Sequence, residues 1–272
     1  MRIVRKLLAA ATAVGALALS ALPSQAAITQ LGFMLDASGS VSTSNYNLLR
    51  SGLANALASL PVDGTVEITI VSYGTSVLTV TAPTILTATT LPNIQTAINT
   101  HAKDSGGTNT AGAITSLTSL LTGSSVFSAS DTKSIMNLAT DGVPNSQSAA
   151  EAAAAAAFSA GIDAMGIEAI GSGVSSLAAL NNMALIAFPD TVTILPVNST
   201  NIPNPTSGSF VVPVSDFTQL DAVLLAKVQA SVNPDPVPEP GSMMLMAGAL
   251  GVMVAISRRK RRDGGSMSLQ AA

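Results

Sequence analysis

The sequence has no cysteine, no tryptophan and only one histidine in 272 residues. The absence of cysteine excludes disulfide bonds, thiolate metal sites and a cysteine nucleophile. The single histidine, His101, cannot supply a histidine-rich metal site. Aromatic residues are also rare, with six phenylalanines and two tyrosines. We therefore expect a core built from alanine, valine, leucine and isoleucine.

Basic residues are scarce in the middle of the chain. The segment from Ile28 to Asn233 holds four lysines or arginines against twelve acidic residues, a net charge of −8. Such a surface repels nucleic acid and anionic polysaccharide unless a metal ion intervenes. No basic stripe is interleaved with aromatic residues, so we expect no nucleic-acid binding.

Motifs of the common enzyme classes are also missing. The sequence has no Gly-x-Ser-x-Gly elbow, no His-Glu-x-x-His and no Walker loop. We therefore expect that the protein is not an enzyme. A metal-dependent hydrolase is the rival interpretation, and chelator-sensitive turnover of a broad substrate panel would support it.

The first 26 residues have the composition of a secretory signal peptide. Arg2, Arg5 and Lys6 precede an apolar run from Leu7 to Leu22, and small residues follow at the usual cleavage spacing, ending at Ala26. A membrane anchor that is never cleaved is the alternative, but the apolar run is short for a span. The prediction is export through the inner membrane.

The C-terminal part has three segments in a fixed order. A proline-rich linker (233–242) contains Pro238-Glu239-Pro240, an apolar run follows from Met243 to Ile256, and basic residues fill positions 258–262. A helix of this run reaches about 21 Å, whereas a bilayer core is about 30 Å thick, so residues 243–262 predict a marginal transmembrane helix with a cytoplasmic basic end. A buried helix with a solvated basic tail is the alternative.

This tail resembles the PEP-CTERM sorting signal of Gram-negative bacteria. The resemblance implies recognition, and removal, by a membrane peptidase of the exosortase type. The mature protein would then have only transient membrane anchoring, before release to the cell surface or the extracellular matrix.

Residues 28–232 alternate between strand-like and helical patterns. Strands are expected at Leu31–Leu35, Val66–Tyr73, Val77–Thr81, Ser134–Thr140, Ala164–Ile170 and Val192–Val197. Helical patterns lie between them, and a last helix is expected from Asp216 to Gln229. Alternating strands and helices predict a doubly wound, mostly parallel six-stranded α/β sheet with helices on both faces.

Oxygen-bearing side chains follow two of these strands. Asp36, Ser38 and Ser40 come directly after the first strand, and Asp141 follows the fourth. Thr108 lies in the Gly106-Gly107-Thr108 loop before a helix. Ligands that are all oxygen suit a hard cation, Mg²⁺ in particular, with Mn²⁺ or Ca²⁺ as alternatives.

These three loops resemble the metal-ion-dependent adhesion site of the von Willebrand factor type A domain. The family pattern is Asp-x-Ser-x-Ser, a later Thr and an Asp after another strand. It implies that Asp36, Ser38, Ser40, Thr108 and Asp141 hold the metal. It also implies the strand order 3-2-1-4-5-6, in which Asp36 and Asp141 end neighbouring strands where the winding reverses.

The function implied is binding rather than catalysis. We expect an exported adhesion protein whose metal ion binds a carboxylate presented by a protein or polysaccharide. The alternative is a structural component of an extracellular matrix or biofilm, with a metal site that is non-functional or only stabilising.

Overall fold

The computed structural model describes residues 28–128, 132–189, 192–205 and 208–232. These residues belong to one compact unit that ends at Val232. The predicted signal peptide (1–26), linker (233–242) and transmembrane segment (243–262) lie outside the described residues. No helix within the described ranges is both long and apolar enough to span a bilayer.

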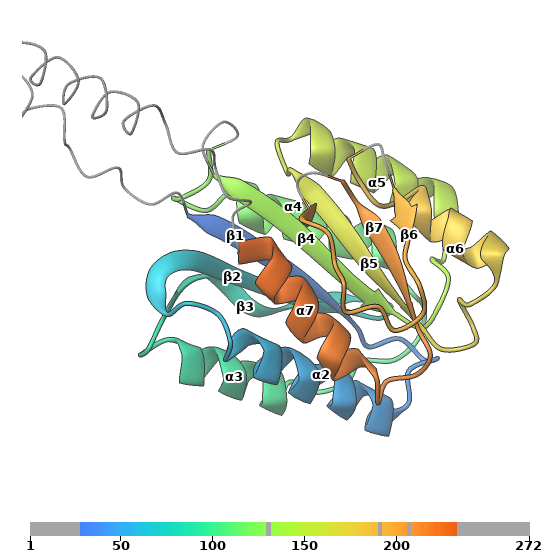
Figure 1. Ribbon diagram of the computed structural model, residues 1–272, viewed down its shortest axis with the longest axis horizontal. Helices are drawn as coiled ribbons and strands as arrows, with labels where there is room; N and C mark the ends of the chain where they lie inside the picture. The colour runs from blue at the N-terminus through green and yellow to red at the C-terminus, as the bar shows by residue number, and fades with distance from the viewer. Residues whose placement is uncertain (1–27, 129–131, 190–191, 206–207, 233–272) are drawn as a thin grey trace, which may run out of the picture. The chain divides into compact units, whose positions relative to one another are not determined.

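A single sheet forms the middle layer of this unit (Figure 1). Its strand order is β3-β2-β1-β4-β5-β7-β6, and only β3 runs antiparallel to its neighbour. The strands are β1 (Thr29–Asp36), β2 (Asp63–Tyr73), β3 (Val77–Thr87), β4 (Lys133–Thr140), β5 (Ala164–Ile170), β6 (Thr193–Ile194) and β7 (Phe210–Val214).

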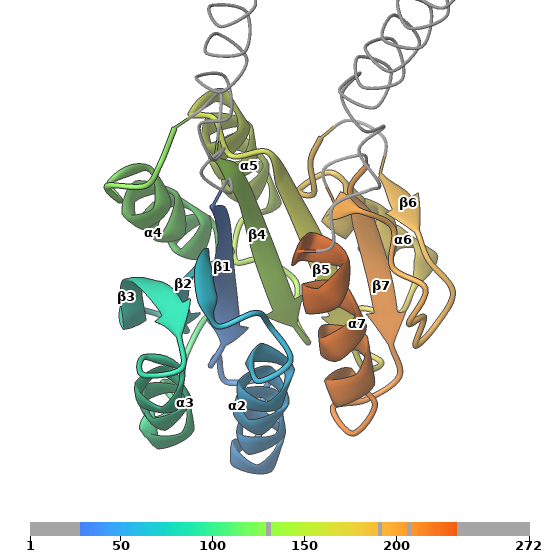
Figure 2. The same cartoon turned by 60° about the vertical axis from the view of Figure 1, so that its left-hand side comes forward.

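Helices cover both faces of the sheet (Figures 1 and 2). One face carries α2 (Thr43–Leu57), α3 (Leu91–Thr100) and α7 (Leu220–Val232), and the other carries α4 (Thr110–Thr122), α5 (Gln147–Ser159) and α6 (Leu177–Ala184). Two apolar clusters fill the spaces between the layers, one on each side of the sheet. The predicted α/β class with helices on both faces is therefore confirmed.

Local sequence explains where several of these helices begin. The hydroxyl of Ser42 accepts a hydrogen bond from the backbone N–H of Asn45 at 3.1 Å, and Asn109 caps α4 in the same way. Ser146 and Ser176 accept from the backbone three residues on, at the starts of α5 and α6. Each cap satisfies a backbone donor that the first turn leaves free, which fixes the residue where the helix begins.

The prediction of six strands was wrong in the last part of the sheet, which has seven strands in total. The segment Val192–Val197 forms only the two-residue edge strand β6, whereas β7 occupies the place beside β5. All five residues of β7 are buried, which an interior strand between two helical layers requires.

A buried ion pair holds α7 against the sheet. The Lys227 ammonium lies 2.7 Å from Glu168 Oε1 and donates a hydrogen bond to the carbonyl of Gly166 at 3.0 Å. Both side chains are almost completely buried. Burial raises the pKa of Glu168 and lowers that of Lys227, while their mutual attraction opposes both shifts.

Candidate metal centre

The candidate site lies where the winding of the sheet reverses. β1 pairs in parallel with β2 on one side and with β4 on the other, so the carboxyl ends of β1 and β4 are adjacent. Asp36 is the last residue of β1, and Asp141 directly follows β4. This confirms the predicted adjacency of the two strands and is the usual place for ligands in open α/β sheets.

Four of the five predicted residues form a connected set of oxygens. The Ser40 hydroxyl donates to Asp141 Oδ1 at 2.6 Å, and the hydroxyl oxygens of Ser38 and Ser40 are 3.0 Å apart. The backbone N–H of Ser38 donates to Asp36 Oδ1 at 2.9 Å. Residues far apart in the sequence therefore present their oxygens to one small region.

Thr108 approaches the same region from the α4 side. A β-carbon built on Gly142 would lie 3.4 Å from both the Ser40 hydroxyl and the Thr108 hydroxyl. Asn145 fixes the Thr108 backbone, because its Oδ1 accepts from the Thr108 N–H at 2.8 Å and its own N–H donates to the Thr108 carbonyl at 2.9 Å. The glycine after Asp141 thus leaves room between the two hydroxyls.

Asp36 is buried and accepts a hydrogen bond from Thr140, the last residue of the neighbouring strand β4. Its side chain has no exposed surface, and Thr140 donates its hydroxyl to Asp36 Oδ2 at 2.5 Å. Burial raises the pKa of the Asp36 carboxyl, and the negative charge of Asp141 adds to this rise. Hydrogen bonds from Ser38 and Thr140 act in the opposite direction and favour the ionised form.

A lysine side chain stabilises the loop after β1 through hydrogen bonds to its backbone. Lys103 donates to the carbonyls of Ala37 and Ser38 at 3.1 and 2.9 Å. Its ammonium therefore binds backbone rather than either carboxylate. Within the described ranges, neither Asp36 nor Asp141 forms a salt bridge, so their charges are left for a cation.

Nearby polar residues have other partners. Asn109 caps α4, and Asp104 accepts a hydrogen bond from the backbone of Ser76 at 3.4 Å. The ring of His101 pairs with the Ser72 hydroxyl at 2.6 Å. These contacts give the three residues roles in the loops that surround the site.

Sequence reasoning did not find the supporting residues Lys103, Thr140 and Asn145. Thr140 precedes Asp141 directly, and Lys103 is one of few lysines in the domain, so both had a weak signal. Asn145 had none. Its role depends on a contact with Thr108 across 37 residues.

The donor set fits a divalent oxygen-preferring ion. Two carboxylates match a charge of +2, and the hydroxyls add neutral oxygen donors. The described part of the chain contains no cluster of three or more histidine, cysteine or acidic side chains, and Asp36 and Asp141 are the two acidic residues among the five candidate ligands. Such a set favours a hard cation over a thiolate- or imidazole-preferring one.

A match to a protein-family model shows which family this chain belongs to. The von Willebrand factor type A domain model matches residues 30–207. The chain belongs to this family. A second model, the PEP-CTERM protein-sorting motif, matches residues 236–262 and confirms the resemblance of the tail. That motif indicates export of this type A domain and a sorting function for the C-terminal segment.

Solved structures of similar fold include matrix and adhesion proteins. Proximal thread matrix protein 1 from the mussel byssus, solved with a zinc-occupied metal-ion-dependent adhesion site, is 16% identical with a TM-score of 0.53. The pilus adhesin SpaC from Lactobacillus rhamnosus GG is 15% identical with a TM-score of 0.57.

These likenesses extend over much of this chain but only part of the other proteins. They cover 75% and 76% of this chain, but only 46% of the mussel protein and 30% of SpaC. At these identities the likeness shows the type A fold alone. No curated protein sequence matches the chain significantly.

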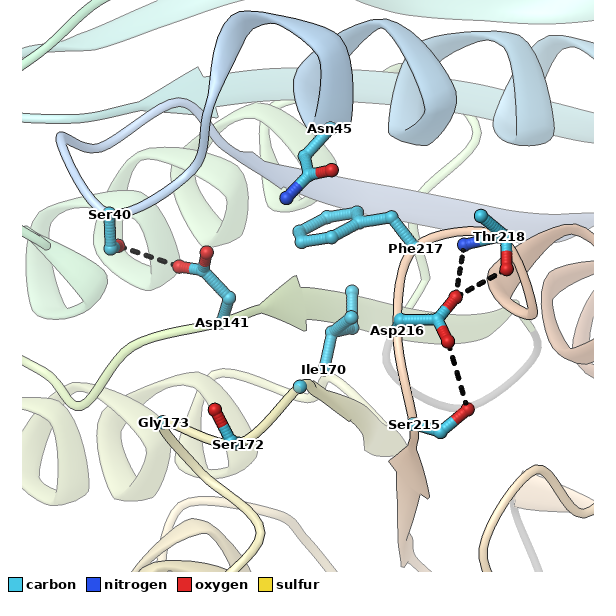
Figure 3. A pocket seen from close by; sticks show the side chains of 11 residues that line it. Ser40, Asn45, Asp141, Ile170, Ser172, Gly173, Ser215, Asp216, Phe217 and Thr218 are labelled. Carbon is cyan, nitrogen blue, oxygen red and sulfur yellow. Dashed lines mark hydrogen bonds between the residues drawn. The ribbon is translucent and has the colours of Figure 1, made fainter.

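A cavity of about 490 Å³ adjoins the candidate metal centre of this type A domain (Figure 3). Ser40 and Asp141 form one end of it. The rest is lined by Asn45 of α2, by Ile170 at the end of β5, and by the loops after β5 and β7, including Ser172 and Phe217. Sequence reasoning placed no functional residue in these two loops.

Proposed function

We propose that this protein is an exported binding protein that holds one divalent metal ion at Asp36, Ser38, Ser40, Thr108 and Asp141. Mg²⁺ is the expected ion, with Mn²⁺ or Ca²⁺ as alternatives. The observation that carries the proposal is the continuous contact from Ser38 to Ser40 to Asp141 beside the buried Asp36. These oxygens come from two strand ends that only the parallel β1–β4 pairing brings together.

The charges of the site favour binding of an anionic partner over catalysis. When bound, the ion supplies a Lewis acid that can accept one more oxygen from outside the protein. The two carboxylates balance its charge and the serine and threonine hydroxyls add none, so an anionic oxygen is the favoured additional ligand. Ser40 and Asp141 line the neighbouring cavity, and Ser40 is exposed to solvent.

The partner is therefore a protein or polysaccharide that presents a carboxylate. Val143, which directly follows Asp141 and Gly142, is 53% exposed. This apolar side chain beside the candidate metal centre supports contact with a partner there. The negative net charge of the domain repels polyanions in general, so the metal ion sets where an acidic group can bind.

The sorting motif supports the place of action. An exosortase-type membrane peptidase is the expected partner of the tail, which anchors the protein until the tail is removed. The type A domain would then reach the cell surface or extracellular matrix of a Gram-negative bacterium.

A structural role in the extracellular matrix or biofilm is the second candidate. The likeness to a thread matrix protein of the mussel byssus favours it. In that case the metal would be absent or would only stabilise the fold. An Asp36→Ala variant that stays in the matrix independently of metal would support this candidate.

Calorimetric titration of Mg²⁺, Mn²⁺ and Ca²⁺ into the full-length protein tests the site. We expect saturable one-site binding that is absent in Asp36→Ala/Asp141→Ala and kept in Asp63→Ala, an exposed carboxylate at the opposite end of the sheet. Retention of carboxylate-bearing peptides on the immobilised protein should then require the metal. Equal retention with and without chelator would contradict the proposed function.

A further inference from the structure

The strand β3 lies at one edge of the sheet, and its outer side pairs with no strand in the described part of the chain (Figure 2). It is 11 residues long, whereas β6, the strand at the opposite edge, has two. An outer edge presents unpaired backbone N–H and carbonyl groups, so proteins usually keep edge strands short or place charged side chains on them. β6 is protected by its length, but β3 is not.

The surface around β3 also lacks charge. No lysine, arginine, aspartate or glutamate occurs from Ile68 to Thr100. This stretch contains the whole of β3 and of α3, the helix that packs against it. Asp63 and Asp104 lie beside opposite ends of β3. The domain as a whole carries a net charge of −8, so two copies repel each other where acidic surfaces meet. Across the middle of β3 they can approach without this repulsion.

The segment Val77–Ala82 of β3 has the backbone donors that strand pairing requires. Each of its six residues has a backbone N–H, whereas Pro83 lacks one. The Thr84 hydroxyl donates a hydrogen bond to the carbonyl of Ala82 at 2.7 Å, which limits pairing beyond this point. Within the segment, Thr79 is exposed. The first half of β3 is therefore the part that another strand can reach.

A groove of about 190 Å³ lies between this strand and α3. Its lining consists of uncharged side chains, which are Val80, Thr81, Thr84, Thr90, Asn93, Ile94 and Ala97. Thr81 is 9% exposed, and its buried hydroxyl has no hydrogen-bond partner among the described residues. A buried hydroxyl without a partner costs free energy, so a polar group that enters the groove from outside would relieve that cost.

We infer that β3 pairs with β3 of a second copy of this chain, antiparallel across a twofold axis, so that two sheets join edge to edge. A twofold interface places the same patch on both copies, so the patch must complement itself. The hydroxyls of Thr79 and Thr81 can each donate and accept, and threonine pairs stabilise neighbouring strands. None of the five candidate metal ligands lies in β3 or α3, so the dimer carries two separate metal centres.

The absence of native cysteine allows a cross-linking test on the full-length protein. One cysteine at a time replaces Leu78, Val80 or Ala82. The matched control is Thr193→Cys, at an exposed position of the opposite edge strand β6. A short bifunctional maleimide should give several times more covalent dimer from at least one β3 variant than from Thr193→Cys, in Mg²⁺ and in chelator alike. High salt should raise this yield, because it screens the repulsion between two acidic domains.

A lysine on the strand assigns the contact to β3. Adding Thr79→Lys to the variant that cross-links best should lower its yield to that of Thr193→Cys, because two like charges would then face each other across the paired strands. Adding Thr193→Lys should leave the yield unchanged. Both lysine variants should keep the native melting temperature, since both positions are exposed.

Two results would overturn the inference. The first is a yield from all three β3 cysteines no greater than that from Thr193→Cys. The second is a dimer that forms only with Mg²⁺ and is lost in Asp36→Asn, because the metal centre would then join the two copies. The first result leaves the proposed function untouched, since metal binding by a single copy does not depend on β3.

Discussion

Replacing Asp36 by asparagine should separate the metal-binding role of this residue from its role in the fold. Asp36 is completely buried, with one oxygen facing the Ser38 N–H and the other facing the Thr140 hydroxyl. An asparagine can keep its oxygen on Ser38 and turn its amide toward Thr140, whose hydroxyl can also accept. The change removes the charge and leaves the packing in place.

The size of the metal effect follows from linkage. A ligand at a hundredfold excess over its Kd stabilises the folded state by about 2.7 kcal/mol. In a domain of about 200 residues this raises the melting temperature by about 5–10 °C. We expect that rise in the native protein when Mg²⁺ replaces chelator, and no rise in Asp36→Asn.

Without metal, Asp36→Asn should be at least as stable as the native protein. Burial and the charge of Asp141 raise the pKa of folded Asp36 above its ordinary value near 3.8. The folded native protein therefore holds this proton more tightly than the unfolded chain, and it loses stability as the pH rises above 3.8, by at most about 1.4 kcal/mol per pH unit. Asp36→Asn lacks this loss, so in chelator its melting temperature should equal or exceed that of the native protein at pH 7.

Thermal unfolding of the full-length protein, followed by circular dichroism with Mg²⁺ or chelator between pH 4 and pH 7, measures both effects. Asp63→Asn is the control, since it removes an exposed charge far from the site. An Mg²⁺-dependent rise in Asp36→Asn equal to the native one would refute the metal assignment. A large drop in its melting temperature in chelator would mean that the carboxylate serves the fold.

Two further predictions concern residues that sequence reasoning did not identify. Asn145→Ala should lower Mg²⁺ affinity about 10- to 100-fold, as is typical when a residue that orients a ligand is lost, because Thr108 loses its clamp. Calorimetric titration measures this, and unchanged affinity would contradict the assigned role. Lys227→Met should destabilise the fold by about 3–5 kcal/mol, because Glu168 is left buried without its partner. Urea denaturation measures this, and adding Glu168→Leu should restore most of the loss.

The sequence by itself determined the class of fold and the residues of the candidate metal centre. The apolar run that becomes β1 ends at Asp36, and the run that becomes β4 ends just before Asp141. Strand ends of this kind lie at one edge of a parallel sheet, and the strand order implied by the family resemblance placed the two carboxylates side by side. The sorting tail could also be predicted from the sequence, because its proline-rich, apolar and basic segments are contiguous.

Only the tertiary structure decided which strand lies beside β5 and what surrounds the metal centre. The edge strand β6 and the interior strand β7 both have apolar, β-branched sequences, and their places depend on which is buried between helical layers. The hydrogen bond between Asn145 and Thr108 joins segments that are distant in sequence. The same holds for Asp141 and Asp216, which line one cavity. Such contacts depend on how loops from different strands pack at the sheet edge, and no local pattern encodes that packing.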